Sequence, residues 1–208
     1  MSKENQYIET LVAKLKEINY VQPGDVPNID LYMDQVTTFM DEYLESSKRY
    51  SDDKLLTKTM INNYTKNGLL PSPDKKKYSK DHMYMLLFIY YLKNILSISD
   101  TKAILTPLTE MFFKSDRRDD TGEEVSLEDI YAEIFRIEEE QSSVIVKDVI
   151  RKYEKSRASF ETVDDSCEKE KEILQNFAFV SMLCFDVHMK KQMIGKLVDE
   201  FFSESKEE

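Results

Sequence analysis

Apolar residues recur at intervals of three and four along most of the chain, and this spacing is typical of amphipathic α-helices. The first such stretch covers about residues 4–19, and a second runs from about Asp30 to Glu45. Between them, residues 22–28 contain two prolines and a glycine, which end helices. The pattern therefore predicts two helices separated by a turn.

A short third helix is predicted at about residues 57–67. Thr57 suits its N-cap, because a threonine hydroxyl can accept hydrogen bonds from the N–H groups of the first turn. Asn67-Gly68 supplies a left-handed stop at the other end. Ile61 and Tyr64 share one face of this helix, and we expect them to point into the core.

The next segment, "LLPSPDKKKY", cannot continue the helix, because Pro71 and Pro73 lack N–H donors. It predicts a small β-hairpin or an extended loop at about residues 72–78. Ser79 then suits the N-cap of a helix that runs roughly from Lys80 to Ile95. The sequence "HMYMLLFIYYL" is apolar on most sides, so we expect this helix at the centre of the core.

Three further helices complete a predicted all-α fold. The segment from Lys114 to Glu124 is charged, contains a glycine and lacks large apolar residues, so it predicts a domain boundary. The helix that follows it has a candidate break at Ser142-Ser143. The three helices are expected at about residues 99–113, from Ser126 towards Tyr153, and at about 167–202.

Charge is distributed unevenly along this chain. The net charge is −11, yet the segment from Lys54 to Lys80 holds seven lysines and one acidic residue, Asp74. That segment carries +6, so the remainder of the chain carries −17. Such asymmetry lets an acidic protein present one locally positive face.

The sequence also predicts the compartment. No segment approaches the run of about 20 apolar residues that a membrane span requires, and the N-terminal residues lack the layout of a signal peptide. The two cysteines, Cys167 and Cys184, form no CxxC motif, so a disulfide framework is not expected. We therefore expect a protein of the reducing cytoplasm that does not contact a membrane.

A short capped helix, a glycine stop, a basic proline-containing loop and an apolar helix follow one another here. This order resembles the winged helix-turn-helix of the MerR family of bacterial regulators, with its G-L-L-P, R-x-Y-S/T and L-x-F-I elements. The resemblance covers roughly Lys54 to Phe112. The matching residues are Thr57, Met60 to Tyr64, Gly68 to Pro71, Lys76 to Ser79, Leu86 to Ile89 and Ser97 to Leu105.

Over most of its length, the chain also resembles a family from Gram-positive bacteria, domain of unknown function 1836. The residues that carry this resemblance are "NNYxKxGL" at Asn62 to Leu69 and "KKKYS" at Lys75 to Ser79. Together the two resemblances imply a DNA-binding domain at residues 30–113 with a small β-hairpin wing. An N-terminal helical extension at 1–29 and a C-terminal helical region at 125–205 would flank it.

The MerR resemblance implies that the short helix enters the major groove of double-stranded DNA while the wing contacts backbone phosphates. Where MerR proteins have arginine, this chain has Asn62 in the helix and Lys76 in the wing, so weaker contacts are predicted. Asparagine can pair bidentately with adenine. The implied DNA-binding residues are Lys58, Thr59, Asn62, Asn63, Lys66, Lys75, Lys76, Lys77 and Tyr78.

Other candidate chemistry is weak. Cys184 and His188 lie four residues apart and would share a helix face, as metal ligands can. The chain has only two histidines and this stretch is apolar, so a buried cysteine is expected instead of a metal site. No Gly-rich phosphate loop, GxSxG motif or oriented Cys/His pair occurs. We expect no catalysis and no cofactor.

The stretch from Phe177 to Val187 is apolar nearly all round, which predicts the centre of a helical domain or a subunit interface. The MerR resemblance implies a homodimer formed through this C-terminal region. Alternatively, the same helix could wall a pocket for a small-molecule effector, with Met182, Phe185 and Met193 as its lining. The alternative to a transcriptional regulator is a non-catalytic protein-interaction module that keeps the winged-helix fold.

Overall fold

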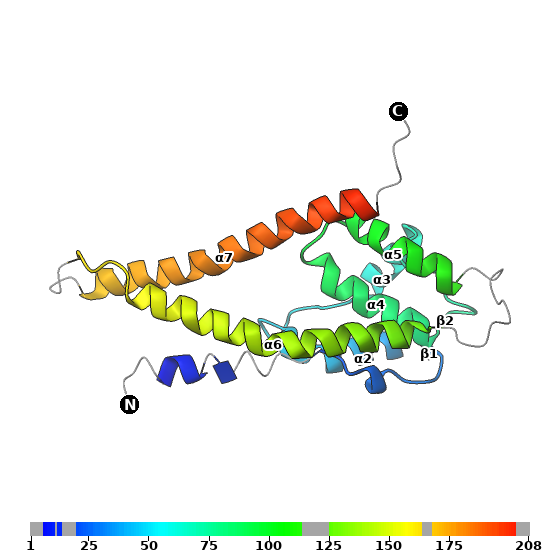
Figure 1. The fold of residues 1–208 in the computed structure, drawn as a ribbon. Coiled ribbons are helices and arrows are strands. Elements are labelled where there is room, and N and C mark those ends of the chain that lie inside the picture. The colour runs from blue at the N-terminus through cyan, green and yellow to red at the C-terminus, as the bar shows by residue number, and fades with distance from the viewer. Residues whose placement is uncertain (1–5, 11, 14–19, 114–124, 164–167, 203–208) are drawn as a thin grey trace. The chain divides into compact units, whose positions relative to one another are not determined.

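The computed structural model describes residues 6–10, 12–13, 20–113, 125–163 and 168–202, and it is mostly helical (Figure 1). The predicted boundary at 114–124 and Cys167 lie outside these residues. In chain order the elements are 3₁₀-helix η1 (Pro23–Asp25), β1 (Leu31–Tyr32), α2 (Met33–Tyr43), 3₁₀-helix η2 (Glu45–Ser47), α3 (Lys58–Lys66), β2 (Lys77–Tyr78), α4 (Lys80–Lys93), α5 (Ile98–Phe113), α6 (Leu127–Arg157) and α7 (Glu168–Phe201).

The chain divides into two compact units. We call the first, Glu17–Ile137 with Leu197–Glu208, the core unit. The second, Met1–Lys16 with Glu138–Lys196, we call the hairpin unit. Both units share the helix α6, whose first part belongs to the core unit and whose last part belongs to the hairpin unit.

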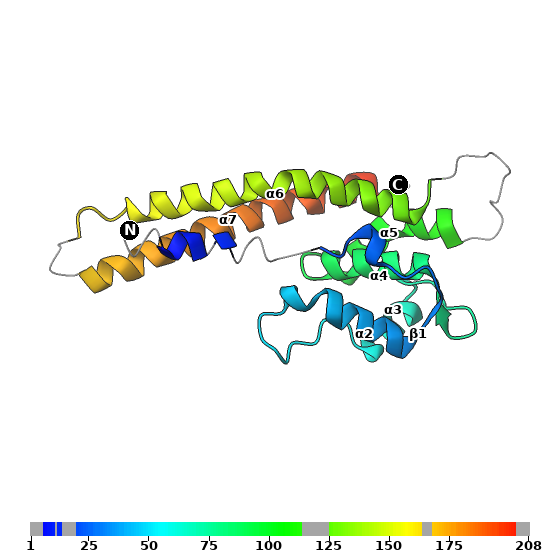
Figure 2. The ribbon, with the colours of Figure 1, turned by 90° about the horizontal axis from the view of Figure 1, so that it is seen from below.

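Helix α4 occupies the centre of the core unit, as its apolar sequence predicted. The side chains from Met83 to Leu87 are all fully buried, which requires neighbours on every side. In Figure 2, α2 and α3 lie on one side of α4 and the first turns of α6 lie on the other. Tyr131 of α6 packs against α4, with its ring centre 5.2 Å from that of Tyr84 and 5.6 Å from that of Phe88.

Two tyrosines of this core fasten the segment that precedes α2. The hydroxyl of Tyr131 donates to the carbonyl oxygen of Val21 at 2.6 Å, and that of Tyr84 donates to the carbonyl oxygen of Pro23 at 2.9 Å. Burial raises the pKa of both phenols, so both remain protonated donors. The turn-rich break predicted from sequence is therefore tied to the centre of the unit.

The only sheet in the described residues has two antiparallel strands, with Leu31 opposite Tyr78 and Tyr32 opposite Lys77. A small β-hairpin or an extended loop was predicted at about residues 72–78, but the partner of β2 is β1, which directly precedes α2. Within 72–78 only the bridge between Asp74 and Lys77 forms. Proline at position 73 has no N–H with which to extend that ladder, whereas Leu31 and Tyr78 bury their side chains together.

The hairpin unit contains the last part of α6 and most of α7, which run antiparallel to each other (Figures 1 and 2). A break at Ser142-Ser143 was predicted, but α6 is continuous there. The Ser142 hydroxyl donates to the carbonyl oxygen of Glu139 at 2.8 Å, so it bonds back to the helix without interrupting it. Lys152 of α6 and Asp186 of α7 form an ion pair at 2.5 Å across the hairpin.

One prediction for α7 is wrong: Cys184, expected to be buried, is exposed. It lies on the side of α7 away from Gln175 and Phe179, whose side chains are buried. No described helix has both the length and the apolar character needed to cross a membrane. Nor do three or more His, Cys, Asp or Glu side chains gather into a metal-binding group anywhere in the described ranges.

Candidate nucleic-acid interface

Both ends of α3 are held by its own sequence, as predicted. The Thr57 hydroxyl oxygen accepts a hydrogen bond from the backbone N–H of Met60 at 3.2 Å. At the other end Gly68 adopts a φ of +66°, and the N–H of Leu69 then donates to the carbonyl oxygen of Tyr64 at 2.9 Å. This is the Schellman ending, which favours glycine because a β-carbon is disfavoured at positive φ.

Helix α3 has one buried face and one exposed polar face. Ile61 is fully buried and Tyr64 is 7% exposed, as predicted for the core-facing side. Because these two residues pack inward, the positions on the opposite side of the helix point to solvent. The exposed residues of α3 are Lys58, Thr59, Asn62, Asn63 and Lys66, all of which were predicted to contact DNA.

Two lysines that were not predicted from the sequence donate hydrogen bonds to backbone carbonyls near the two ends of this helix. The ammonium group of Lys102, on α5, donates to the carbonyl oxygen of Asn67 at 3.1 Å, where α3 ends. Lys93, on α4, donates to the carbonyl oxygen of Leu55 at 2.7 Å, just before α3 begins. A positive charge at a helix C-terminus is favoured by the helix dipole. Neither residue lies near α3 in sequence, so no local signal could have identified them.

The segment from Asp74 to Lys77 forms a tight turn, which we call the wing turn. The N–H of Lys77 donates to the carbonyl oxygen of Asp74 at 2.7 Å. The two central residues, Lys75 and Lys76, have φ values of +46° and +66°. Two successive positive φ values are typical of type I′ turns, where Asn-Gly is preferred. The chain instead has two lysines there, with exposed side chains and a strained backbone.

Residues 21–134 match the family described as Domain of unknown function (DUF1836). The chain belongs to the DUF1836 family. This match confirms the family resemblance seen in the sequence. No curated protein and no solved structure matches the chain. The matched range begins before β1 and ends inside α6, so α3 and the wing turn both lie within the DUF1836 domain.

The lysines of the DUF1836 domain differ in what they contact. Lys58 forms an ion pair with Asp34 of α2, so its charge is partly neutralised. The ammonium group of Lys77 lies 5.4 Å from the centre of the Tyr32 ring, a cation–π distance. Among the lysines predicted to contact DNA, those that form no ion pair with any described residue are Lys66, Lys75, Lys76 and Lys77.

Tyr78 was predicted to contact DNA, and the structure corrects this. Its side chain is only 3% exposed, and its ring packs edge-to-face against His82, with ring centres 5.7 Å apart. Burial raises the pKa of its hydroxyl. Successive side chains of a strand point to opposite faces, so the outward position of Lys77 directs Tyr78 into the core. Tyr78 therefore anchors the wing turn of the DUF1836 domain.

His82 fixes the chain where the wing turn meets α4. Its Nδ1 accepts a hydrogen bond from the backbone N–H of Ser79 at 3.2 Å and lies 2.8 Å from the Ser79 hydroxyl oxygen. Burial lowers the pKa of His82, although the Ser72 carbonyl and the Asp30 carboxylate act in the opposite direction. A neutral imidazole therefore completes the capping box of α4 in the DUF1836 domain.

Proposed function

We propose that this protein is a DNA-binding transcriptional regulator whose DUF1836 domain works as a MerR-like winged helix-turn-helix. In this proposal α2 and α3 are the helix-turn-helix pair, α3 is the recognition helix and the wing turn contacts the neighbouring backbone. The observation that carries it is the exposed face of α3, which has two lysines, two asparagines and no acidic residue.

The dimensions and order of these elements support the proposal. A nine-residue helix is about 13 Å long, close to the width of about 12 Å of the DNA major groove. The residues near the N-terminus of a recognition helix contact base edges, while its flanking elements contact phosphates. Thr59, Asn62 and Asn63 occupy the first two turns of α3, and Lys66 follows in its last turn.

Asn62 is the residue we assign to base recognition. An asparagine side chain can donate from its amide nitrogen to adenine N7 and accept at its amide oxygen from adenine N6–H, a bidentate pair that discriminates by about 1–3 kcal/mol against a wrong base. The proposal therefore predicts a preference for A·T steps.

The strained wing turn supports phosphate contact. A non-glycine residue in the left-handed region costs about 1 kcal/mol, and Lys75 and Lys76 both adopt it. Their side chains form no ion pair with any described residue that would repay this strain. Strained residues cluster at functional sites, where the side chain rather than the backbone is required. Mobile ammonium groups at a turn tip suit the phosphates of a duplex.

The proposal includes a homodimer, because α7 has an apolar outer face that no described part of the hairpin unit covers. Gln175 and Phe179 face α6 and are 8% and 7% exposed. On the other side of α7, four apolar side chains spaced by four and three residues, with Cys184 in the same row, are 56–70% exposed. These four are Ile173, Phe177, Val180 and Val187.

A second copy of this chain is the occupant we infer for that face. Monomers rarely expose contiguous apolar patches beyond a few hundred Å². The alternating spacing of four and three residues is the pattern by which helices pack on one another in coiled coils. Two copies would also present two recognition helices, as a palindromic DNA site requires. The face therefore fits a helical partner with the same pattern.

Binding to genomic DNA tests the proposed function. Fragments of genomic DNA are titrated with the full chain at about 50 mM and about 200 mM salt, and fluorescence polarisation reports binding. We expect saturable binding that weakens steeply with salt. The variant Lys66→Glu/Lys75→Glu/Lys76→Glu should lose it, and the control Lys147→Glu/Lys155→Glu, which changes exposed lysines of the hairpin unit, should not.

A wild-type chain that binds no fragment at about 50 mM salt would contradict the proposal, because phosphate contacts are strongest there. That outcome would favour the non-catalytic interaction module. The exposed apolar face of α7 is the observation that favours this second candidate. Circular dichroism of each variant ensures that loss of binding is not loss of fold.

A further inference from the structure

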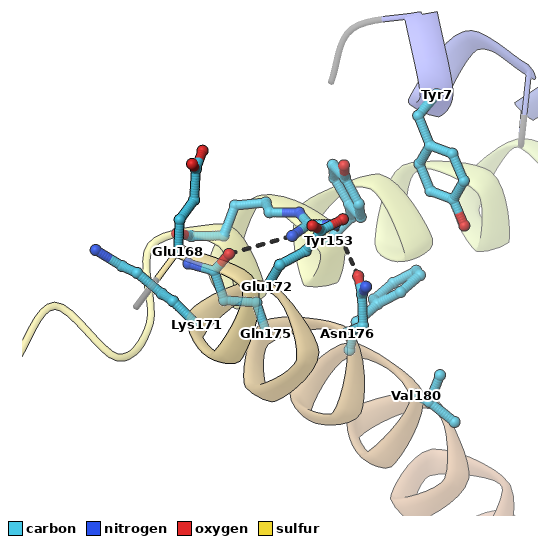
Figure 3. A pocket seen from close by; sticks show the side chains of 10 residues that line it. Tyr7, Tyr153, Glu168, Lys171, Glu172, Gln175, Asn176 and Val180 are labelled. Atoms are coloured by element: carbon cyan, nitrogen blue, oxygen red, sulfur yellow. Dashed lines mark hydrogen bonds between the residues drawn. The ribbon is translucent and has the colours of Figure 1, made fainter. Parts of the chain in front are cut away.

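A cleft in the hairpin unit lies between the end of α6 and the start of α7, beside the helical residues near the N-terminus (Figure 3). Its volume is about 840 Å³, within the range of pockets that hold small molecules. Three aromatic rings form one wall, with ring centres 5.6 Å apart between Tyr7 and Tyr153 and 5.4 Å apart between Tyr153 and Phe179. Tyr153 and Phe179 are largely buried, so the ring that this wall exposes to a ligand is mainly that of Tyr7, which is 52% exposed.

Arg157, the last residue of α6, sets the charge at one end of this wall. Its guanidinium carbon lies 4.9 Å from the centre of the Tyr153 ring. Two amide oxygens accept from it, that of Gln175 at 3.1 Å and that of Asn176 at 2.7 Å. These bonds use two of the five N–H groups of the guanidinium. No described carboxylate lies within ion-pairing distance of Arg157.

Gln175 holds the guanidinium in a fixed orientation. Its side-chain nitrogen donates to the carbonyl oxygens of Arg157 at 2.8 Å and of Ser159 at 3.2 Å, which closes the C-terminal end of α6. Both amide protons are thereby used, so the amide oxygen must face the arginine. Gln175 is 8% exposed and cannot turn outward without losing these bonds. The arginine is consequently positioned before any ligand arrives.

We propose that this cleft binds a small monocarboxylate with an aromatic body. The carboxylate accepts from the unused N–H groups of Arg157, in the paired geometry that a guanidinium favours. The ring of the ligand packs mainly against the exposed Tyr7 and reaches the edges of the largely buried Tyr153 and Phe179, where aromatic contacts add to burial. The residues that the sequence suggested for an effector pocket, Met182, Phe185 and Met193, do not line this cleft.

The rim of the cleft selects against other ligands. Glu168 and Glu172 lie at its edge and would repel a dianionic phosphate more strongly than a singly charged carboxylate. A cationic amine could approach these two carboxylates, but the fixed charge of Arg157 opposes it. A neutral ring would use the aromatic wall alone. A singly charged carboxylate attached to an aromatic ring is therefore the ligand that this arrangement of residues favours most. Its binding does not depend on DNA binding by the core unit.

Calorimetric titration of the full chain with three probes tests the proposal. The probes are benzoate, neutral benzamide and cationic benzylamine. For benzoate we expect saturable binding with a Kd on the order of 0.1–1 mM, as suits so small a ligand. Benzamide and benzylamine should bind at least tenfold more weakly. Equal affinity for all three probes overturns the proposal. So does the absence of benzoate binding at concentrations up to about ten times the highest expected Kd.

Variants locate the site within the cleft. Arg157→Gln should weaken benzoate binding at least tenfold, and Arg157→Lys should weaken it less, because the charge remains while the paired donors are lost. Glu172→Gln should strengthen binding two- to fivefold, since it removes a competing negative charge. Arg151→Gln, an exposed arginine of α6 outside the cleft, should change nothing.

If Arg157→Gln does not fold, the opposite effects of Arg157→Lys and Glu172→Gln still decide the matter. Binding that is unchanged in both variants contradicts the assignment of the carboxylate to Arg157. Thermal melts with and without benzoate give a second readout, since a ligand that binds the folded chain raises its Tm.

Discussion

Replacing Lys75 by asparagine and Lys76 by glycine in the wing turn should stabilise the protein and weaken its DNA binding at once. Both residues have positive φ, at +46° and +66°. Relief of the left-handed backbone recovers about 1 kcal/mol per residue, but glycine returns roughly 0.5–1 kcal/mol through the greater entropy of its unfolded chain. Asparagine tolerates this region better than lysine does.

The net gain in the free energy of unfolding is therefore about 1–1.5 kcal/mol, which corresponds to a Tm increase of roughly 2–6 °C for a chain of this length. DNA binding should change in the opposite direction. Each lysine–phosphate contact adds about 0.9 to the slope of log K against log salt, so two lost contacts reduce it by about 1.8 per copy. At about 0.15 M salt the expected loss of affinity is roughly 30-fold per copy.

A matched variant separates charge from strain. Lys75→Gln/Lys76→Gln removes both charges but keeps side chains at the two strained positions. It should lose as much DNA affinity as the Asn-Gly variant and gain no stability. Thermal melts followed by circular dichroism measure stability, and polarisation with a labelled mixed-sequence duplex between about 50 and 200 mM salt measures the slope.

Two results would refute this reasoning. An unchanged salt slope in both variants would show that the wing turn does not reach phosphates. A lower Tm in the Asn-Gly variant than in the Gln-Gln variant would show that the two lysines are not strained. Glycine and asparagine stabilise a position relative to other residues only where φ is positive.

Three further predictions follow from the described contacts. Asn62→Ala should alter the base preference of selected DNA fragments without altering the salt slope, because an amide carries no charge; an identical sequence profile would exclude Asn62 from readout. Phe177→Ser/Val180→Ser should shift the sedimenting species from dimer to monomer. The control Met189→Ser should not, because Met189 is 68% exposed on another side of α7. A monomeric wild type at micromolar concentration would contradict the dimer. His82 has a lowered pKa in the folded chain. As the pH falls below the unfolded pKa of about 6.5, only the unfolded chain gains a proton at His82, so the free energy of unfolding decreases. His82→Gln should flatten this decrease in urea titrations at a series of pH values.

The helices and their caps could be predicted because their signals are local. The spacing of apolar residues that shows Ile61 and Tyr64 as one face lies within a few residues of chain. The same holds for the Thr57 cap, the Ser79 cap and the left-handed Gly68, each of which satisfies backbone groups beside it. A sequence states such relations directly.

Contacts between distant segments carry no comparable signal. Nothing near Lys77 and Tyr78 indicates that their partner strand lies before α2, because any extended segment offers the same backbone groups. Likewise, nothing in the sequence distinguishes Lys102 from the other lysines. Its contact with the end of α3 depends on where α5 packs. The cleft at Arg157 depends on residues from two helices and from the N-terminal residues.

The exposure of Cys184 shows a different limit. Helix α7 is apolar on two faces, one towards Gln175 and Phe179 and one along the row that contains Cys184. A helix that is apolar all round is expected to bury both faces. The pattern does not show whether each face packs against this chain or against another molecule. The apolar pattern predicted either the centre of a helical domain or a subunit interface, and in the single chain only the face with Gln175 and Phe179 is buried while Cys184 is exposed.

The same face also decides how a strongly acidic chain could bind DNA. Outside the segment from Lys54 to Lys80 the chain carries −17, so a duplex approaching it is repelled except where the +6 of that segment lies close. At physiological salt, charges are screened beyond about 8 Å, and under the proposed function we expect the few lysines of one copy to hold a duplex only weakly against this repulsion. Two copies joined through α7 would double those contacts at one site and raise affinity by effective concentration. A chain made monomeric by Phe177→Ser/Val180→Ser would therefore keep every lysine of its interface and still lose most of its affinity for DNA.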